Sequence, residues 1–172
     1  MDDFTLNLLG VLGLSVADRI REAASEVLRH SGETPAALVV IGYGYGPTNN
    51  QVKDVLGLSH PGTVRLIDRL VAEGLVERRR GQDRREVALY ATRRGMEARE
   101  QINQGRLMRV DPLLENLPAP ERKQLNRLLK KMLESLDTTG LERQNLCRPC
   151  DKRVRRARPI PAELWGTPQA HY

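Results

Sequence analysis

The stretch TNNQVKDVLGLSHPGTVRLIDRLVAEGLVERRRGQDRREVALYAT, residues 48–92, decides how the chain is organised. Its first part, Asn49 to Leu56, predicts a short helix. Gly57 ends this helix, because glycine readily adopts the left-handed backbone found at helix ends. Ser59 then caps a second helix, which continues to Gly74. We therefore expect two consecutive helices joined by a tight turn.

The second helix has an apolar face and a polar face. Apolar side chains recur at three- and four-residue intervals, which is typical of a buried helix side. They are Val64, Ile67, Leu70 and Val71. The start of the other face carries side chains that can reach base edges in the major groove of DNA. The candidate contact residues of this helix are His60, Pro61, Gly62, Thr63, Arg65 and Arg69.

Each of these candidates has an expected role. Arg65 can make a bidentate contact with guanine, whereas Arg69, one turn later, is expected to meet a phosphate. Thr63 can touch a thymine methyl group or a phosphate. The two small residues before it let the backbone approach the groove floor. For His60, a DNA contact and a solvent-facing position at the helix start stand as equal alternatives.

An arginine-rich hairpin follows the second helix. Two short runs, residues 75–80 and 86–90, flank a tip that carries glycine and aspartate, and this pattern predicts two antiparallel strands. Arginines occupy both the first strand and the tip. A helix that can enter a groove, followed by such a hairpin, fits duplex DNA better than a small substrate.

Positive charge is concentrated in two parts of the chain. The net charge of the 172 residues is +6. Residues 48–94 hold 10 basic and 6 acidic side chains, and residues 143–172 hold 7 basic and 2 acidic side chains. An uneven distribution of this kind is the electrostatic pattern expected for a polyphosphate partner such as DNA.

These motifs, in this order, resemble those of the multiple-antibiotic-resistance regulator (MarR) family. The matching residues are Leu58-Ser59, Thr63-Val64, Leu66 to Leu70, Glu73 to Val76, Arg78-Arg79, Asp83 to Arg85, Thr92 and Gly95. The resemblance extends over the flanking helices, from about Leu6 to Leu136. It implies a mainly α fold with a small β-hairpin wing (α+β), which is a winged helix-turn-helix flanked by dimerisation helices.

On this basis we expect the chain to have four segments. Residues 1–33 form an N-terminal dimerisation helix, and residues 34–94 form the winged helix-turn-helix DNA-binding domain, here called the reader. Residues 95–141 form C-terminal dimerisation helices. Residues 142–172 form a basic, flexible tail with a C-x-x-C motif, which we expect to be extended or disordered when no partner is bound.

The resemblance also implies a contact for the hairpin tip. In family members with an Asp-x-Arg tip, the arginine enters the minor groove and the aspartate orients it, and the matching residues here are Asp83 and Arg85. A narrow A·T-rich groove concentrates negative potential, which attracts a guanidinium group. Strand alternation takes Arg79 away from the DNA if its two neighbours face it. The expected phosphate contacts of the hairpin are Arg78, Arg80 and Arg84.

Amphipathic helices flank the reader. The first predicted helix, Phe4 to His30, carries an apolar stripe of Leu9, Leu12, Val16, Ile20, Ala23 and Val27. The helix that Thr92 caps, which Pro112 interrupts, has an apolar side of Met96, Ile102, Leu107, Met108 and Leu114. The stripe of the last helix is Leu125, Leu128, Leu129, Met132, Leu133 and Leu136.

The first and last helices carry more apolar surface than one small reader can cover, which favours a homodimer. The resemblance implies that these terminal helices interlock. A two-fold dimer would place two recognition helices on the two half-sites of a palindromic operator in double-stranded DNA.

Two further segments bear on ligands. A short core helix that begins at Thr34-Pro35 leads into an alternating glycine string with Tyr43 and Tyr45. The string follows a helix and lacks a Lys-Ser/Thr pair, so a flexible connection is favoured over a phosphate loop. The two tyrosines are candidates to line an effector cavity. The resemblance implies that such a pocket for a small molecule lies between the dimerisation helices and the reader.

The tail contains one chemical motif, formed by Cys147 and Cys150. A C-x-x-C pair is half of a zinc site or a redox pair. Three alternatives stay open: an inert exposed pair, a redox-sensitive pair, and a half-site for zinc completed by His171, Asp151 or a second subunit. We expect no cofactor unless zinc binds here.

The expected function is that of a homodimeric transcriptional repressor that a small-molecule or redox effector releases from its operator. An enzyme is disfavoured, because the sequence offers no Ser-His-Asp constellation, no metal tetrad and no phosphate loop. The alternatives are a winged-helix module that binds protein and a metal or redox sensor that acts through the C-x-x-C tail. Acidic residues precede the first apolar patch, which is unlike a signal peptide, so we expect a cytoplasmic protein with no membrane partner.

Overall fold

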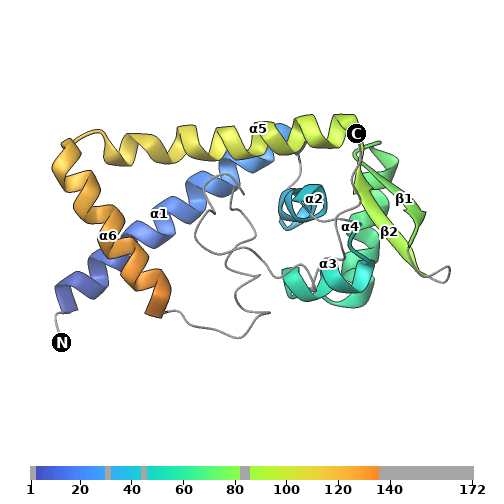
Figure 1. The fold of residues 1–172 in the computed structure, drawn as a ribbon, viewed down its shortest axis with the longest axis horizontal. Helices are drawn as coiled ribbons and strands as arrows, with labels where there is room; N and C mark the ends of the chain where they lie inside the picture. Colours follow the sequence, from blue (N-terminus) through green and yellow to red (C-terminus); the bar gives the residue numbers. More distant parts are fainter. Residues whose placement is uncertain (1–2, 30–31, 44–45, 82–85, 136–172) are drawn as a thin grey trace.

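The computed structural model describes residues 3–29, 32–43, 46–81 and 86–135 (Figure 1). This part of the chain is mainly helical with a two-stranded antiparallel sheet, which confirms the predicted fold class. The elements, in chain order, are α1 (Asp3–Leu28), α2 (Thr34–Tyr43), α3 (Asn49–Leu56), α4 (His60–Ala72), β1 (Val76–Arg80), β2 (Val87–Ala91), α5 (Arg93–Val110), the 3-10 helix η1 (Asp111–Leu114) and α6 (Ala119–Ser135).

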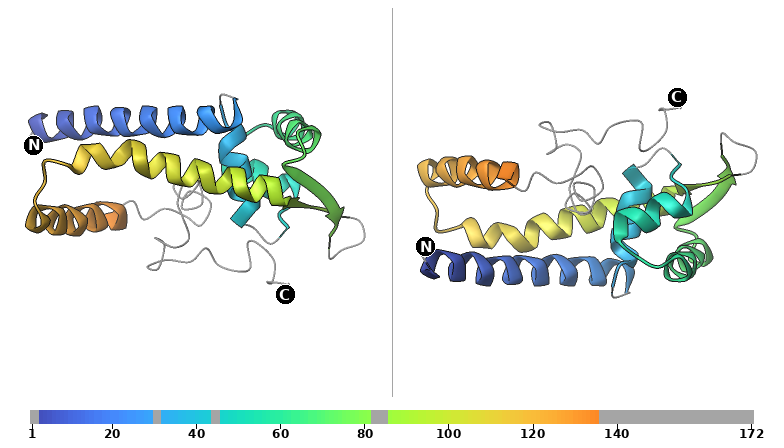
Figure 2. Two further views of the ribbon diagram at one scale, coloured as in Figure 1. Left: turned by 90° about the horizontal axis from the view of Figure 1, so that it is seen from above. Right: turned by 90° about the horizontal axis from the view of Figure 1, so that it is seen from below.

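The two longest helices, α1 and α5, lie side by side, and the reader is gathered at one end of this pair (Figures 1 and 2). Polar contacts fasten the two helices together. Arg109 on α5 pairs with Glu26 and with Glu22, at 3.4 Å between Nη1 and Oε2 for the second pair. Arg19 donates a hydrogen bond to the carbonyl of Arg109 at 3.2 Å. Helix α6 turns back from the far end of α5, on the side of α5 away from α1 (Figure 2).

Helix α2 forms the centre of the hydrophobic core. Its residues 37–41 are all apolar and buried, as predicted for a core helix. The side chains that surround it come from every other element of the reader and from both long helices. Its fully or nearly fully buried partners include Leu28, Val52, Val55, Leu56, Ile67, Leu70, Val76, Leu89 and Ile102.

The turn between α3 and α4 is built from local hydrogen bonds, as the sequence predicts. Thr48 and Gln51 form a capping box at the start of α3, with Gln51 Oε1 accepting from Thr48 N at 2.8 Å. Gly57 ends α3 in the left-handed region with a φ of 65°. Ser59 caps α4, because its Oγ accepts from Gly62 N at 3.3 Å. These bonds satisfy backbone groups that helix ends leave without partners.

The start of α5 packs closely on the turn that follows α4. Gly74 has a φ of 67° in this turn. Thr92 caps α5 by accepting from Gly95 N at 3.1 Å, and its hydroxyl donates to the carbonyl of Gly74 at 2.7 Å. A Cβ atom added at Gly95 would lie 1.9 Å from the carbonyl oxygen of Leu75. Only glycine fits here, so the end of α4 and the beginning of α5 form one rigid joint.

The apolar sides predicted for the long helices are only partly buried in the single chain. Of the stripe expected on α1, only Ala23 is buried, while Leu9 and Leu12 are 42% and 45% exposed. The expected apolar side of α5 does not form a single buried face. Ile102 is buried, but the exposed members of this side are Met96, Leu107 and Met108. Small and polar residues of α5 contact α1 and α2: Gly105 lies beside Ala23, Arg99 donates to the carbonyl of Gly42, and Asn103 is buried.

Helix α6 presents its predicted stripe to solvent in the single chain. Leu125 is half-buried, and the exposed members of the stripe are Leu128, Leu129, Met132 and Leu133. The predicted interruption at Pro112 is confirmed, because α5 ends at Val110 and a 3-10 turn follows. Leu136, the last residue of the stripe, lies outside the described residues.

We predict that Gly95→Ala lowers the free energy of unfolding by about 1–3 kcal/mol, since the added methyl overlaps backbone that must shift. Urea unfolding followed by circular dichroism measures this change. The control is Gly105→Ala on the same helix, where the new Cβ would lie 3.6 Å from the Cβ of Ala23, an ordinary contact. That variant should gain about 0.5–1 kcal/mol from helix propensity. If the two variants had equal free energies of unfolding, the close packing of α5 on the turn after α4 would be refuted.

Candidate nucleic-acid interface

The start of α4 forms an exposed polar surface. His60 occupies the first helical position and is exposed together with Pro61, directly after the Ser59 cap. Arg65 and Arg69 are exposed further along the same helix. Neither arginine forms an ion pair with any residue that the structure describes. Both guanidinium groups are therefore available to a ligand that approaches α4.

Gly62 contributes to this surface through its size. A Cβ at this position would lie 3.1 Å from Ser59 Oγ, so glycine lets the capping hydroxyl sit tightly over the first turn. Gly62 is half-buried, so the backbone of this turn lies close to the surface of α4.

Thr63 differs from its expected role. Its side chain is fully buried, and its hydroxyl donates to the carbonyl of Ser59 at 3.0 Å. It therefore does not reach a base edge, and the prediction of a DNA contact for Thr63 is wrong. The helical period contains the reason, because Thr63 lies on the same face as Leu66, Ile67 and Leu70. An apolar stripe counted from Thr63 would have revealed its burial.

The hairpin arginines have different surroundings. Arg78 pairs with Asp68 on α4, with 2.5 Å between Nη2 and Oδ1. Arg79 pairs with Glu77, and its guanidinium lies 4.8 Å from the ring centroid of Tyr90. The predicted alternation is confirmed, since Arg78 and Arg79 turn to opposite faces of the strand. Each of these two arginines already has a carboxylate partner.

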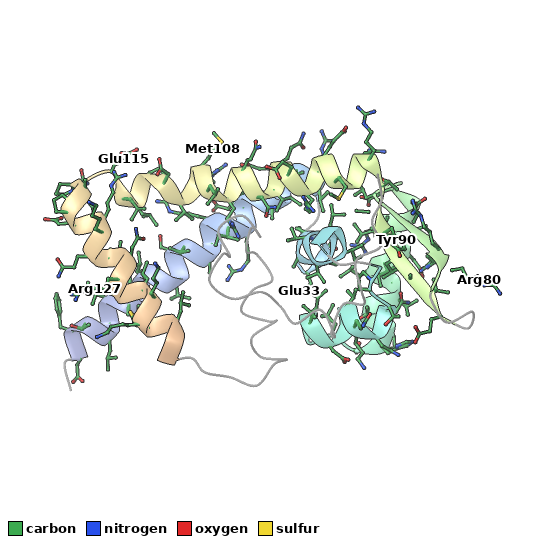
Figure 3. All side chains as sticks on the ribbon, in the orientation of Figure 1. Glu33, Arg80, Tyr90, Met108, Glu115 and Arg127 are labelled. Atoms are coloured by element: carbon green, nitrogen blue, oxygen red, sulfur yellow. The ribbon has the colours of Figure 1, made fainter. Side chains whose placement is uncertain are left out.

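Arg80 is the exception on this strand. It is exposed and projects from the end of the hairpin (Figure 3). Among the described residues it forms no ion pair. The residues at the hairpin tip with predicted roles, Asp83, Arg84 and Arg85, lie outside the described residues.

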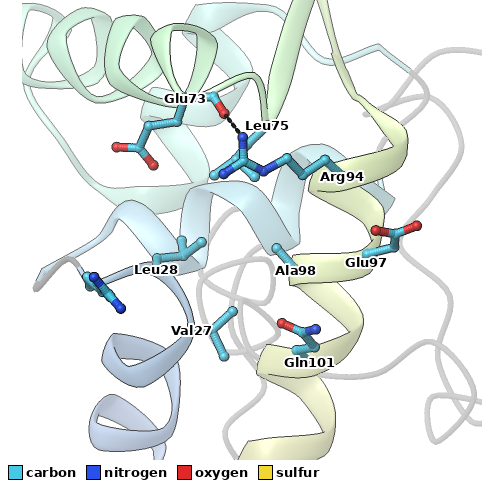
Figure 4. Close-up of a pocket in the computed structure, with 9 residues that line it drawn as sticks. Val27, Leu28, Glu73, Leu75, Arg94, Glu97, Ala98 and Gln101 are labelled. Atoms are coloured by element: carbon cyan, nitrogen blue, oxygen red, sulfur yellow. Dashed lines mark hydrogen bonds between the residues drawn. The ribbon is translucent and has the colours of Figure 1, made fainter.

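A cavity of about 470 Å³ lies where the end of α1, the turn after α4 and the start of α5 meet (Figure 4). Its apolar lining is Val27, Leu28, Leu75 and Ala98. Arg94 also lines it and donates to the carbonyl of Glu73 at 3.1 Å. The sequence did not predict these lining residues, because they come from helix ends that are far apart in the chain.

The other ligand candidates fall outside the described part of the chain. Tyr43 is the last residue of α2, but its side chain is not among the described groups, and neither is any part of Tyr45. Cys147 and Cys150 also lie outside the described residues. Within those residues there is no group of three or more His, Cys, Asp or Glu side chains arranged to hold a metal ion. The same residues contain no helix that is both long and apolar enough to cross a membrane.

Comparison with known proteins gives a consistent result. A model of the MarR family matches residues 33–86. MarR of E. coli, solved as a cysteine-to-serine mutant, is 29% identical, with a TM-score of 0.63 over 74% of this chain and 94% of that chain. RV1404 from Mycobacterium tuberculosis is 21% identical, with a TM-score of 0.71 over 80% of this chain and 96% of that chain.

A third solved structure is a mutant of S. aureus MepR bound to an oligodeoxyribonucleotide. It is 22% identical, with a TM-score of 0.58 over 77% of this chain and 98% of that chain. No curated protein sequence matches the chain.

The family model covers α2, α3, α4 and β1, which together present the exposed arginines. The solved structures reproduce the fold over a much longer part of the chain. Residues 33–86 therefore belong to the MarR family of winged helix-turn-helix DNA-binding transcriptional regulators, which are not enzymes, and the flanking helices complete the fold of the solved MarR structure.

Proposed function

We propose that the protein is a homodimeric repressor that binds a palindromic operator in double-stranded DNA and leaves it when an effector binds. The observation that carries this proposal is the exposed polar side of α4, with His60 at its start and Arg65 and Arg69 further along, beside the hairpin with Arg80. This surface lies at one end of the molecule, and the exposed apolar helices extend to the other end (Figure 1). DNA and a second subunit can then be bound at the same time.

In this proposal the two DNA-binding elements have separate tasks. Helix α4 enters the major groove, where Arg65 contacts a guanine and Arg69 a phosphate, with His60 near the bases. Arg80 contacts phosphate from the hairpin, and Arg85, oriented by Asp83, enters the minor groove. The complex of MepR with an oligodeoxyribonucleotide supports DNA as the partner, because MepR has the same fold.

The exposed apolar side chains support the homodimer. The N-terminal half of α1 leaves large apolar groups in solvent, and so does α6. These groups are Phe4, Leu6, Leu8, Leu9, Val11, Leu12, Leu14, Leu128, Leu129, Met132 and Leu133. Exposed apolar surface on this scale marks an interaction site. A two-fold dimer buries the same surface on both subunits and requires only one kind of chain.

The cavity supports release by a small molecule. Its volume of about 470 Å³ is in the range of small-molecule sites. Arg94 lines the cavity and also donates a hydrogen bond to the carbonyl of Glu73, the residue that caps the end of α4. A ligand that attracted the Arg94 side chain would break this hydrogen bond and let the end of α4 move. A redox effector would instead act through Cys147 and Cys150.

We predict that Arg65→Ala relaxes the choice of base at one symmetric position in each half-site, at a cost of about 1–3 kcal/mol. Arg85→Ala should weaken binding to all sequences, and most where the flanks are A·T-rich. The measurement is a titration on duplexes varied at the centre and flanks of each half-site. Arg127→Ala on α6, far from the reader (Figure 3), is the control and should bind like the wild type.

The two grooves are assigned wrongly if Arg85→Ala alters base choice within the half-site while Arg65→Ala lowers affinity evenly. A wild-type chain that enriches no sequence from a random duplex library would contradict sequence-specific binding itself.

We predict that Leu129→Asp converts the dimer to monomer or unfolds it, because a charge would be buried at the interface without a partner. Light scattering at micromolar concentration measures the mass, and circular dichroism measures the helix content. Gln124→Asp, on the polar side of the same helix, adds the same charge and should leave the dimer intact. A folded wild-type monomer at this concentration would contradict the proposal that a dimer binds the two half-sites of the operator.

A further inference from the structure

The ion pair between Asp68 and Arg78 joins the two elements that carry the DNA-facing arginines. Asp68 lies on α4, and Arg78 lies in the middle of β1. Their side chains are 54% and 37% exposed, respectively, and Nη2 is 2.5 Å from Oδ1. The pair therefore links the helix directly to the hairpin at the surface of the reader.

The strand register explains why Arg78 faces α4. Arg78 is paired with Leu89, which is fully buried, and it lies on the same side of β1 as the buried Val76. This side of the hairpin packs toward the core and α4. Arg79 lies on the other side, where its contacts with Glu77 and Tyr90 remain within the hairpin. Arg78 is thus the strand arginine that is placed to tie the hairpin to the helix.

We propose that Asp68 and Arg78 are positioning residues, which hold the hairpin at a fixed angle to α4, and that Arg78 is not a phosphate ligand. This inference rests on the proposed DNA binding. The phosphate contact on this strand then belongs to Arg80 alone.

Charge balance favours this assignment. To reach a phosphate, Arg78 would have to leave Asp68, and the freed carboxylate on α4 would then repel the DNA. If Asp68 and Arg78 stay paired, their charges cancel at the place where α4 and β1 meet. The pair also becomes stronger when DNA excludes water from it, because charges interact more strongly at low dielectric. An exposed pair contributes little to folding stability, so its main effect is on geometry.

The experiment begins with the wild-type chain, which selects a preferred operator from a random duplex library. Three variants are then titrated on that operator and on a random duplex at several salt concentrations: Asp68→Asn, Arg78→Gln and the double variant. Arg80→Gln is the matched control, because it removes one exposed arginine from the same strand. Thermal unfolding followed by circular dichroism verifies that all four variants remain folded, as expected for exposed positions.

We expect each single variant to bind the operator about tenfold more weakly, which is the effect of one misaligned base contact. The double variant should be no weaker than either single variant, because the two residues act as one unit. It should keep the wild-type salt dependence and the wild-type affinity for the random duplex. Arg80→Gln should weaken both duplexes, and its salt slope should fall by about 0.9 for each phosphate that the side chain no longer neutralises.

The opposite result is equally distinct. If Arg78 binds phosphate, Asp68→Asn frees it and tightens binding, and the double variant loses salt dependence as Arg80→Gln does. Wild-type affinity in all three pair variants would also overturn the inference. Failure of the wild-type chain to select any operator would instead remove the proposed function, and the inference would fall with it.

Discussion

The close backbone approach between Gly95 and the carbonyl of Leu75 is the constraint on which the rest of the arrangement depends. Because there is no room for a Cβ, α5 and the turn after α4 move together. Thr92 and Arg94 reinforce the same joint by binding the carbonyls of Gly74 and Glu73. The orientation of the polar start of α4 is therefore set by the long helix, which also carries the contacts with α1.

This joint also explains where the cavity lies. The cavity opens beside the joint, and its walls come from α1, α5 and the turn after α4. Arg94 belongs to both features, since it lines the cavity and binds Glu73. In a regulator that responds to a small molecule, a ligand in this cavity could affect the position of α4 through few contacts. These contacts are the side chain of Arg94 and the carbonyl of Glu73 at the end of α4.

Local structure was predictable from the sequence, and burial was predictable only in part. The caps at Ser59 and Thr92 and the left-handed Gly57 depend on neighbouring residues, so their types and spacing were sufficient. The burial of Thr63 was not predicted, because its side chain is polar although it lies on an apolar face.

The partner of Arg78 and the exposure of the α1 stripe depend on what lies opposite in space, and no local pattern records that. The pairing of Arg78 with Asp68 joins residues on two different elements, and only the folded arrangement brings them together. The stripe on α1 is apolar as predicted, but in the single chain its first half stays partly exposed, at Leu9 and Leu12. The same reasoning applies to the stripe on α6.

The central position of α2 has a consequence for how the protein is made on the ribosome. Almost all the side chains that cover this apolar helix come from later in the chain, the last of them Ile102 on α5. While the chain emerges from its N-terminal end, the cover of residues 37–41 stays incomplete until Ile102 has been synthesised. A fragment that stops at residue 94, where the reader ends, would lack Ile102, which leaves part of the helix open to water and prone to aggregation. The reader therefore needs residues of α1 and α5 to complete its hydrophobic core.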